Sequence, residues 1–348
     1  MNNNKRLLAT LLVLFMLTMA IGGCGSTATQ SSAAPASPAS PAASQSSETM
    51  PAPQEEFISM GTSSSGGTFN TLGVAICQMW SEKIDKTQFS AEVTGGSSEN
   101  CARVGAGEIQ MAFAAASSAY DAFNGKGQFE GKPVSNLRAV ANLYPAIMQF
   151  PVLQSSGIKN LGDISGKKIN IGQAGSGSEA QVLAILASYG IEISSFNPQQ
   201  LSHANASDAL LDEKLDGYLI SGSLGQSHQM KAMSSGKAFM ASFEPMEKMQ
   251  KLIDEYPYYY EYTIPAGAYP NQDYDVPTVA TGTLLIVNES VSEELVYQAT
   301  KAMFENVQAL AQTQEIANEI KTETALNVSG LTLHPGAERY YKEIGLIK

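Results

Sequence analysis

Apolar residues along the chain follow two alternating periods, which predict strands followed by helices. A short strand is predicted at 57–60, and the apolar residues within 72–80 then recur three and four positions apart, as on one face of a helix. The same order appears at 89–93 and at 168–172, each followed by a glycine- and serine-rich loop and a helical pattern. Strands that alternate with helices predict an α/β fold with largely parallel sheets.

Two longer apolar stretches, at 146–153 and 278–287, are rich in β-forming residues, and the third glycine loop lies between them. They are expected to be hinge strands that flank an inserted second domain. The first lobe would then comprise 57–148 with 283–348, and the second lobe 149–282.

The beginning of the chain has the pattern of an export signal. Lys5 and Arg6 precede a run of apolar residues, and the run ends in Ile21-Gly22-Gly23-Cys24, which resembles the lipobox of bacterial lipoproteins. This predicts a signal peptide over 1–23 and a lipid anchor on Cys24. The alternative is that Cys24 is an ordinary residue near a signal peptide cleaved elsewhere.

The Ser/Ala/Pro-rich stretch 24–56 has almost no large apolar side chains and is expected to be a linker.

Composition narrows the class of protein. The chain has 348 residues, of which 43% are hydrophobic and 16% charged. A chain of this length and composition can bury a sizeable core and has room for two domains. Its formal charge of −12 would become −14 after loss of Lys5 and Arg6, which argues against nucleic acid as a partner. Cys77 and Cys101 could form one disulfide, but Cys77 lies on an apolar helix face, which favours a buried free thiol.

The first glycine loop, Gly61 to Gly73, reads GTSSSGGTFNTLG and comes one side chain short of a phosphate-binding loop, because Gly67 stands where Lys would be needed. Backbone N–H groups, short hydroxyls and a helix N-terminus nevertheless make such a loop a ready anion site. A carboxylate suits it better than a triphosphate. Alternatively the glycines allow tight turns, and Ser65 or Thr68 caps a helix.

Catalytic patterns are poorly represented. The histidines are His203, His228 and His334, and neither the G-x-S-x-G nucleophile elbow nor the H-E-x-x-H metal pattern occurs. No pair of carboxylates stands out as an acid and a base. We therefore expect a binding protein and not an enzyme.

Several motifs together resemble the TAXI family, the solute receptors of one class of TRAP (tripartite ATP-independent periplasmic) transporters. They occur in the family's order from Phe57 to the C-terminus. The motifs are Met60-Gly61-Thr62 through Gly73, Gly95-Gly96-Ser97-Ser98-Glu99-Asn100, Ala106-Gly107-Glu108, Gly166 to Gly172 with Gly175-Ser176-Gly177-Ser178-Glu179, and His334-Pro335-Gly336-Ala337-Glu338-Arg339-Tyr340-Tyr341.

The resemblance implies a two-lobed periplasmic-binding-protein fold, type II-like, with the ligand closed between the lobes. It also implies a small carboxylate ligand, such as a glutamate-like amino acid or a dicarboxylate, and delivery to an ion-gradient-driven TRAP permease. The receptor would be held by its lipid at the outer face of the cytoplasmic membrane. No catalytic residue, cofactor or metal follows from the resemblance. A binding protein of an ATP-driven importer, or a sensory lipoprotein of the same fold, remains an alternative.

Carried over position by position, the resemblance gives a set of ligand-binding candidates. Glu179 has two interpretations: it accepts a hydrogen bond from a ligand ammonium group, or it favours the helix N-terminus where it lies, and the second is preferred. The candidates carried over are Ser64, Gly67, Thr68, Phe69, Ser97, Asn100, Ser176, Gly177, Ser178 and Glu179. Two more are Ser117, in a run that departs from the family, and Tyr144, an aromatic residue just before the first expected hinge strand that could cover the ligand.

Two departures from the family affect the expected ligand. Phe69 is followed by Asn70 where relatives place a second aromatic ring, and Ala115-Ala116-Ser117 replaces a common Gln-Ser-Asp run. The second change removes a carboxylate and an amide from the expected site. The ligand can therefore be less cationic than those of relatives.

Overall fold

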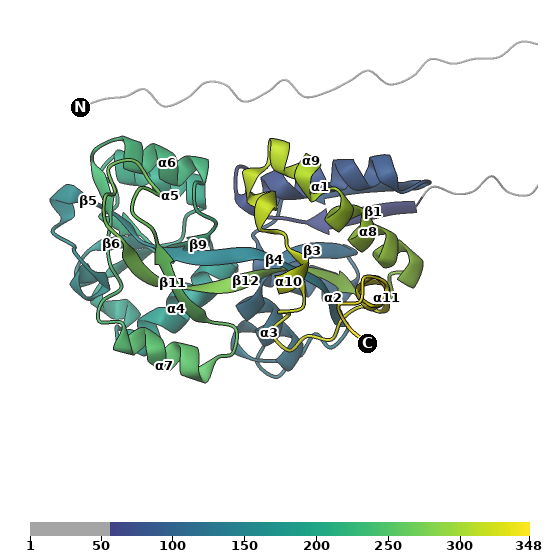
Figure 1. Cartoon of the computed structure of the whole chain (residues 1–348). Coiled ribbons are helices and arrows are strands. Elements are labelled where there is room, and N and C mark those ends of the chain that lie inside the picture. Colours follow the sequence, from purple (N-terminus) through teal and green to yellow (C-terminus); the bar gives the residue numbers. More distant parts are fainter. Residues whose placement is uncertain (1–55) are drawn as a thin grey trace, which may run out of the picture. The chain divides into compact units, whose positions relative to one another are not determined.

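The computed structural model describes residues 56–348, arranged as in Figure 1. The expected signal peptide, the lipidated Cys24 and nearly all of the linker lie outside the described residues. Within the described part, no helix is both long and apolar enough to cross a membrane.

The first sheet has the order β2-β1-β3-β12-β4-β9, and β11 also pairs with β12. The strands β1, β2 and β3 are parallel, as the alternating strand and helix pattern predicted, whereas β12 runs antiparallel to both β3 and β4. The strands are β1 (Glu56–Gly61), β2 (Thr87–Glu92), β3 (Met111–Ala115), β4 (Leu137–Gln149), β9 (Ile220–Gly222), β11 (Tyr260–Ile264) and β12 (Val276–Asn288).

A second, smaller sheet has the order β10-β5-β8-β6-β7. Its β6 pairs in parallel with β7 and β8, and β5 is antiparallel to its neighbours. The strands are β5 (Pro151–Leu153), β6 (Lys168–Asn170), β7 (Asn197–Gln199), β8 (Gly217–Tyr218) and β10 (Ala238–Met240).

Helices cover both sheets (Figure 1). Those of the first lobe are α1 (Thr68–Lys83), α2 (Ser97–Ala106), α3 (Ala116–Asn124), α8 (Glu293–Glu305), α9 (Val307–Thr313), α10 (Thr322–Ala325) and α11 (Pro335–Glu343). Those of the second are α4 (Gly177–Tyr189), α5 (His203–Leu211), α6 (Ser227–Ser234) and α7 (Glu247–Glu255). Short 3-10 turns occupy Gly127–Phe129, Gln154–Ser156, Leu161–Ile164, Ile193–Ser195 and Glu315–Glu319.

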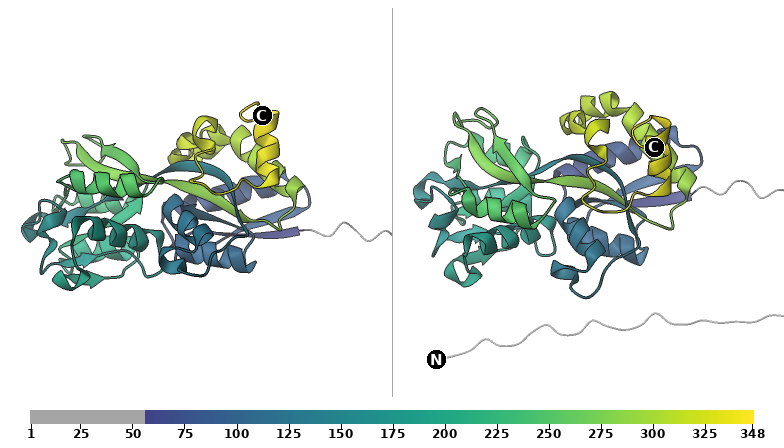
Figure 2. Two further views of the ribbon diagram at one scale, coloured as in Figure 1. Left: turned by 90° about the horizontal axis from the view of Figure 1, so that it is seen from below. Right: turned by 60° about the horizontal axis from the view of Figure 1, so that its bottom comes forward.

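Two long strands run from one lobe into the other, as Figure 2 shows for β4 and β12. At one end β12 pairs with β3, and at the other the pair is extended by β9 and β11. The predicted strand at 146–153 is interrupted: β4 ends at Gln149, and β5 begins two residues later in the other sheet. The chain thus changes sheets at Phe150.

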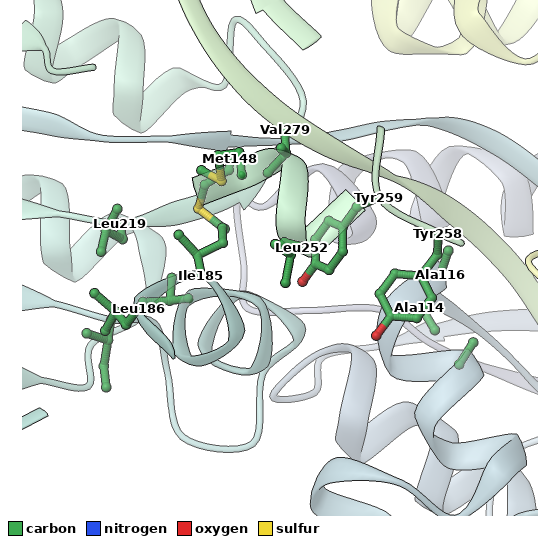
Figure 3. Close-up of a cluster of buried hydrophobic side chains, with 14 of the residues drawn as sticks. Ala114, Ala116, Met148, Ile185, Leu186, Leu219, Leu252, Tyr258, Tyr259 and Val279 are labelled. Atoms are coloured by element: carbon green, nitrogen blue, oxygen red, sulfur yellow. The ribbon is translucent and has the colours of Figure 1, made fainter. Parts of the chain in front are cut away.

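Of the apolar clusters, one lies in the first lobe, one in the second lobe and the hinge strands, and one spans both lobes. In the first lobe Trp80 is fully buried and its indole N–H donates to the Ala299 carbonyl at 2.8 Å, which fixes α1 against α8. Figure 3 shows part of a cluster that spans both lobes: it includes Ile185 and Leu186 of α4 in the second lobe, and Ala114 and Ala116 of the first. Tyr256, Tyr258 and Tyr259 pack against one another in this cluster with their rings tilted or edge-on.

Candidate functional site

Six helices begin around one cavity between the lobes. The N-terminal residues or N-caps of α1, α2 and α3 line it from the first lobe, and those of α4, α5 and α6 from the second. The cavity is small, about 50 Å³. Because the first N–H groups of a helix have no intrahelical acceptor and the helix dipole is positive there, this arrangement favours an anion.

The first glycine loop forms one side of the cavity. Ser64, Thr68 and Phe69 line it, and the Phe69 ring stands edge-on to Phe113 with centroids 5.5 Å apart. Helix α1 has no side-chain cap at its N-terminus, so its first N–H groups are not taken by a neighbouring side chain. Gly67 is the N-cap itself and does not line the cavity.

The second loop contributes Gly95, Gly96 and Ser97. Gly96 has φ +108°, a conformation that glycine adopts without strain, and it begins α2 without a side-chain cap. The Ser97 hydroxyl oxygen accepts the Ala115 N–H at 2.9 Å, which ties the start of α2 to the end of β3. Two helix N-termini are thereby fixed side by side.

The third loop faces them from the second lobe through Ser176, Gly177 and Ser178. Ser176 caps α4 by accepting the Glu179 N–H at 3.1 Å. The Ser178 hydroxyl accepts the Ser221 N–H at 3.1 Å and lies 3.3 Å from His203 Nε2. Residues of three elements of the second lobe are therefore held together at Ser178.

Glu179 does not line the cavity. Its carboxylate accepts the Gly175 N–H at 2.7 Å and a hydrogen bond from the Gln200 amide. Glu99 repeats the arrangement in the second loop, where its carboxylate accepts the Gly95 N–H at 2.8 Å. Both glutamates thus tie their loop back onto the first turn of a helix. This agrees with the preferred interpretation of Glu179 as a helix N-terminal group.

Asn100 and Ser117 were predicted to bind ligand but lie behind the cavity wall. The Asn100 amide donates to the carbonyls of Thr62 and Phe113 at 2.7 and 2.8 Å, so it joins the residue after β1 to the middle of β3. Ser117 is buried in the first turn of α3. Among the other candidates, Tyr144 lines the cavity from β4, although its hydroxyl has no hydrogen-bond partner.

The two lobes contact each other across the cavity. The Thr68 hydroxyl of α1 lies 2.7 Å from the Ser223 hydroxyl and accepts a hydrogen bond of 2.6 Å from the Gln226 amide. Gly177 approaches so closely that a Cβ there would lie 2.5 Å from the Ser97 hydroxyl oxygen. These contacts define a closed arrangement of the lobes.

Sequence reasoning missed a part of the wall in the second lobe, which consists of Gln173, Gln181, His203, Ser221, Gly222, Ser223 and Gln226. A signal for some of it was present, since 220–227 repeats the strand, glycine loop and helix order as Ile-Ser-Gly-Ser-Leu-Gly-Gln-Ser. Gln181 and His203 lie within or after helical patterns and carried no such signal. A layer behind supports this loop: Gln149 donates to the Ser223 carbonyl at 3.2 Å and accepts from the Tyr269 hydroxyl.

Several polar atoms of the wall have no hydrogen-bond partner among residues 56–348. They are the Tyr144 hydroxyl, Gln181 Nε2, His203 Nδ1 and Gln226 Oε1. Burial of an unpaired polar atom is costly, so such atoms at a cavity indicate contacts with a bound molecule or with water. Burial also lowers the pKa of His203 to about 3 and that of neighbouring His228 to about 4, which keeps both rings neutral near pH 7.

Charged side chains are absent from the lining within residues 56–348. The same part of the chain contains no group of three or more His, Cys, Asp or Glu side chains placed to hold a metal ion. Cys77 and Cys101 are both buried free thiols and lie outside the cavity.

The two lobes, the strands that connect them and the cavity between them define the class: the fold is that of two-lobed periplasmic solute-binding proteins, as the sequence predicted. The chain belongs to the NMT1-like family, whose model matches residues 60–345.

Solved structures with a similar fold have low sequence identity. A protein of Bordetella bronchiseptica RB50 is 14% identical with a TM-score of 0.50, over 84% of this chain and 89% of that one. The alkanesulfonate-binding protein SsuA of Xanthomonas axonopodis pv. citri, bound to MOPS, is 15% identical with a TM-score of 0.46, over 78% and 86%. The amino acid ABC transporter substrate-binding protein AbpA of Streptococcus pneumoniae, bound to L-arginine, is 10% identical with a TM-score of 0.44, over 77% and 96%.

Proposed function

We propose that the protein is an extracytoplasmic receptor that captures a small carboxylate between its lobes and delivers it to a membrane transporter. The convergence of helix N-termini on the cavity carries this proposal. Helices α1, α2, α3 and α6 have no side-chain cap, so a carboxylate can accept hydrogen bonds from their first N–H groups. The hydroxyls of Ser64, Thr68 and Ser97 add donors on the same side of the cavity.

A nucleotide or polyphosphate fits the cavity poorly. Each phosphate adds charge that proteins usually offset with Lys, Arg or a bound magnesium ion. The lining within the described residues contains none of these cations and no carboxylate to hold a metal. Partial charges at helix ends match a single carboxylate better.

The transporter is proposed with two candidates. The resemblance in the sequence implies a TRAP permease, but the family and the similar structures support only the broader class of solute receptor. The other candidate is an ATP-driven importer; AbpA is described as the substrate-binding protein of an amino acid ABC transporter. A lipid anchor on Cys24 would hold the receptor beside either transporter.

Ligand binding can be tested with the full-length chain purified in detergent. A ligand that binds only the folded state raises its stability by RT ln(1 + [L]/Kd), so melting temperatures are measured against carboxylates, amino acids and neutral sugars. We expect shifts with carboxylates and none with sugars. Absence of any shift and of any calorimetric heat with carboxylates would contradict the proposal.

Uptake in cells distinguishes the transporters. Uptake of the radiolabelled ligand is compared between wild-type and deletion strains after ATP depletion and after collapse of ion gradients. An ATP-driven importer fails in the first condition with the gradient maintained, and a TRAP permease fails in the second with ATP maintained. Equal uptake by the deletion and wild-type strains would instead favour a sensory role.

A further inference from the structure

The wall of the cavity carries several polar groups among apolar surface, but within residues 56–348 it contains no charged side chain. Two glutamates lie next to lining residues in the sequence, but their carboxylates bind other groups. The Glu179 carboxylate accepts hydrogen bonds from the Gly175 N–H and the Gln200 amide. The Glu99 carboxylate accepts the Gly95 N–H and lies 3.8 Å from the Arg103 guanidinium. Neither belongs to the lining. A ligand in this cavity therefore meets helix N-termini, hydroxyls, amides and a neutral imidazole.

A ligand ammonium group has no suitable partner here. An amino acid would place a positive charge near the positive ends of several helices, with no carboxylate on the wall to offset it. Moving a charge out of water without a partner of opposite sign is costly. This argues against the glutamate-like ligand that the sequence resemblance implied.

A second carboxylate on the ligand is also disfavoured. No Arg or Lys lines the cavity in the described part of the chain, and the amide nitrogen of Gln226 already donates to Thr68, so it is not free to donate to a second carboxylate. The small volume of the cavity also favours a ligand without a second carboxylate. About 50 Å³ holds a few water-sized groups, at roughly 10–15 Å³ each, so a small molecule fits without further separation of the lobes.

The wall of the second lobe nevertheless offers hydrogen bonds to a neutral polar group. Gln181 is 2% exposed with an unpaired Nε2, and Gln226 is 8% exposed with an unpaired Oε1. The ring of His203 lines the cavity with its Nδ1 unpaired. The Gln181 nitrogen is a donor and the Gln226 oxygen is an acceptor, so a ligand hydroxyl can use both atoms, and a keto oxygen can accept from the donor.

On the basis of the function proposed above, we propose that the ligand is a small monocarboxylate with a neutral hydroxyl or keto group. The ligand carboxylate binds the N-termini of the first-lobe helices. Gln181, His203 and Gln226 form hydrogen bonds with its neutral hydroxyl or keto group. These three residues determine the specificity of the receptor against amino acids, dicarboxylates and plain fatty acids.

Calorimetry with compounds that differ by one group tests this directly. The reference is lactate, both enantiomers; alanine replaces the hydroxyl with an ammonium group, malate adds a carboxylate, and propionate removes the hydroxyl. We expect lactate to bind at least about tenfold more tightly than alanine or malate, and about fivefold more tightly than propionate. Pyruvate, with its keto group, is expected to resemble lactate.

A variant of Gln226 tests whether this residue determines the preference for lactate over propionate. Gln226→Met removes the amide at similar volume and should reduce the ratio of lactate to propionate affinity to about one, even though its lost contact with Thr68 weakens both. Gln250→Met, on the exposed face of α7, is the matched control and should keep the ratio. An unchanged ratio in Gln226→Met would overturn the assignment of this residue.

The outcomes separate this inference from the proposed function. Tighter binding of malate, alanine or glutamate than of lactate would overturn the monocarboxylate inference and leave the carboxylate receptor intact. Failure of every carboxylate to bind would overturn both.

Discussion

Thr68 and Ser223 lie in opposite lobes, and their hydroxyl oxygens are 2.7 Å apart across the cavity. The Gln226 amide donates to the same Thr68 oxygen, so one hydroxyl at the start of α1 connects two positions of the second lobe. Closure of the lobes over a ligand and hydrogen bonding at Thr68 are therefore coupled.

Thr68→Val removes these hydrogen bonds at nearly constant volume. We expect ligand affinity to fall about fivefold to tenfold, since a neutral hydrogen bond contributes ~1 kcal/mol to the closed state. Thr71→Val is the control, because Thr71 lies one turn further along α1 and does not line the cavity. Calorimetry measures both variants, and equal loss of affinity in the two would show that contact with Ser223 and Gln226 is unimportant.

Gly177→Ala tests the close approach of the lobes. The added Cβ would meet Ser97 Oγ at 2.5 Å and Ser118 Oγ at 3.2 Å, both across the cavity. We expect affinity to fall about tenfold or more because the lobes cannot close fully, with little loss of stability in the free protein. The double variant Ser97→Gly, Gly177→Ala should bind better than the sum of the single effects predicts. Additive losses would contradict a clash between these two residues.

Glu179→Gln distinguishes a helix N-terminal role from a ligand-binding one. The buried carboxylate accepts hydrogen bonds from Gly175 and Gln200, so its neutralisation should lower the free energy of unfolding by about 2 kcal/mol with less than a threefold change in affinity. Glu99→Gln, at the equivalent but more exposed position of α2, should cost less. Loss of binding in Glu179→Gln with unchanged stability would restore Glu179 as a ligand-binding residue.

The histidines of the second lobe should make stability depend on pH. Burial lowers the pKa of His228 to about 4, so below pH 6.5 the unfolded state takes up a proton that the folded state does not. Stability should therefore fall as the pH drops from 6.5 toward 4, by about 1.4 kcal/mol per pH unit for each such ring. His228→Gln should flatten this slope in urea titrations. An unchanged slope would mean that His228 is protonated in the folded protein.

The thiols of Cys77 and Cys101 should be unreactive in the folded protein. Burial raises the pKa of Cys77 to about 12 and raises that of Cys101 as well, and only the thiolate is a good nucleophile. Iodoacetamide at pH 8 should leave both unlabelled in the native protein and label both in guanidinium, as read for each peptide by mass spectrometry. A native disulfide would instead block labelling in guanidinium without reductant.

The strand, glycine loop and helix units could be predicted because each depends on neighbouring residues. The periodicity after Gly67, Gly96 and Ser176 identified α1, α2 and α4, three of the six helices that begin at the cavity, and eight of the twelve candidate ligand-binding residues line it. The four that do not line it, Gly67, Asn100, Ser117 and Glu179, lie within three positions of a lining residue in the same loop or helix. A loop pattern places a segment near a site, but the direction of each side chain depends on contacts with other strands, as at Asn100.

By itself the sequence determined the local elements: alternating strands and helices, loops with free N–H groups, and the fold class that follows from their order. Only the tertiary structure decided which side chains meet. Thr68 reaches Ser223 over 155 positions because β4 and β12 carry the chain between the lobes and bring distant loops to one cavity. Ser178 meets His203 over 25 positions within the second lobe, where α4 and α5 begin side by side. The absence of charge from the cavity lining also depends on the tertiary structure. The carboxylates of Glu99 and Glu179 accept hydrogen bonds from the Gly95 and Gly175 N–H groups in their own loops, and neither side chain lines the cavity.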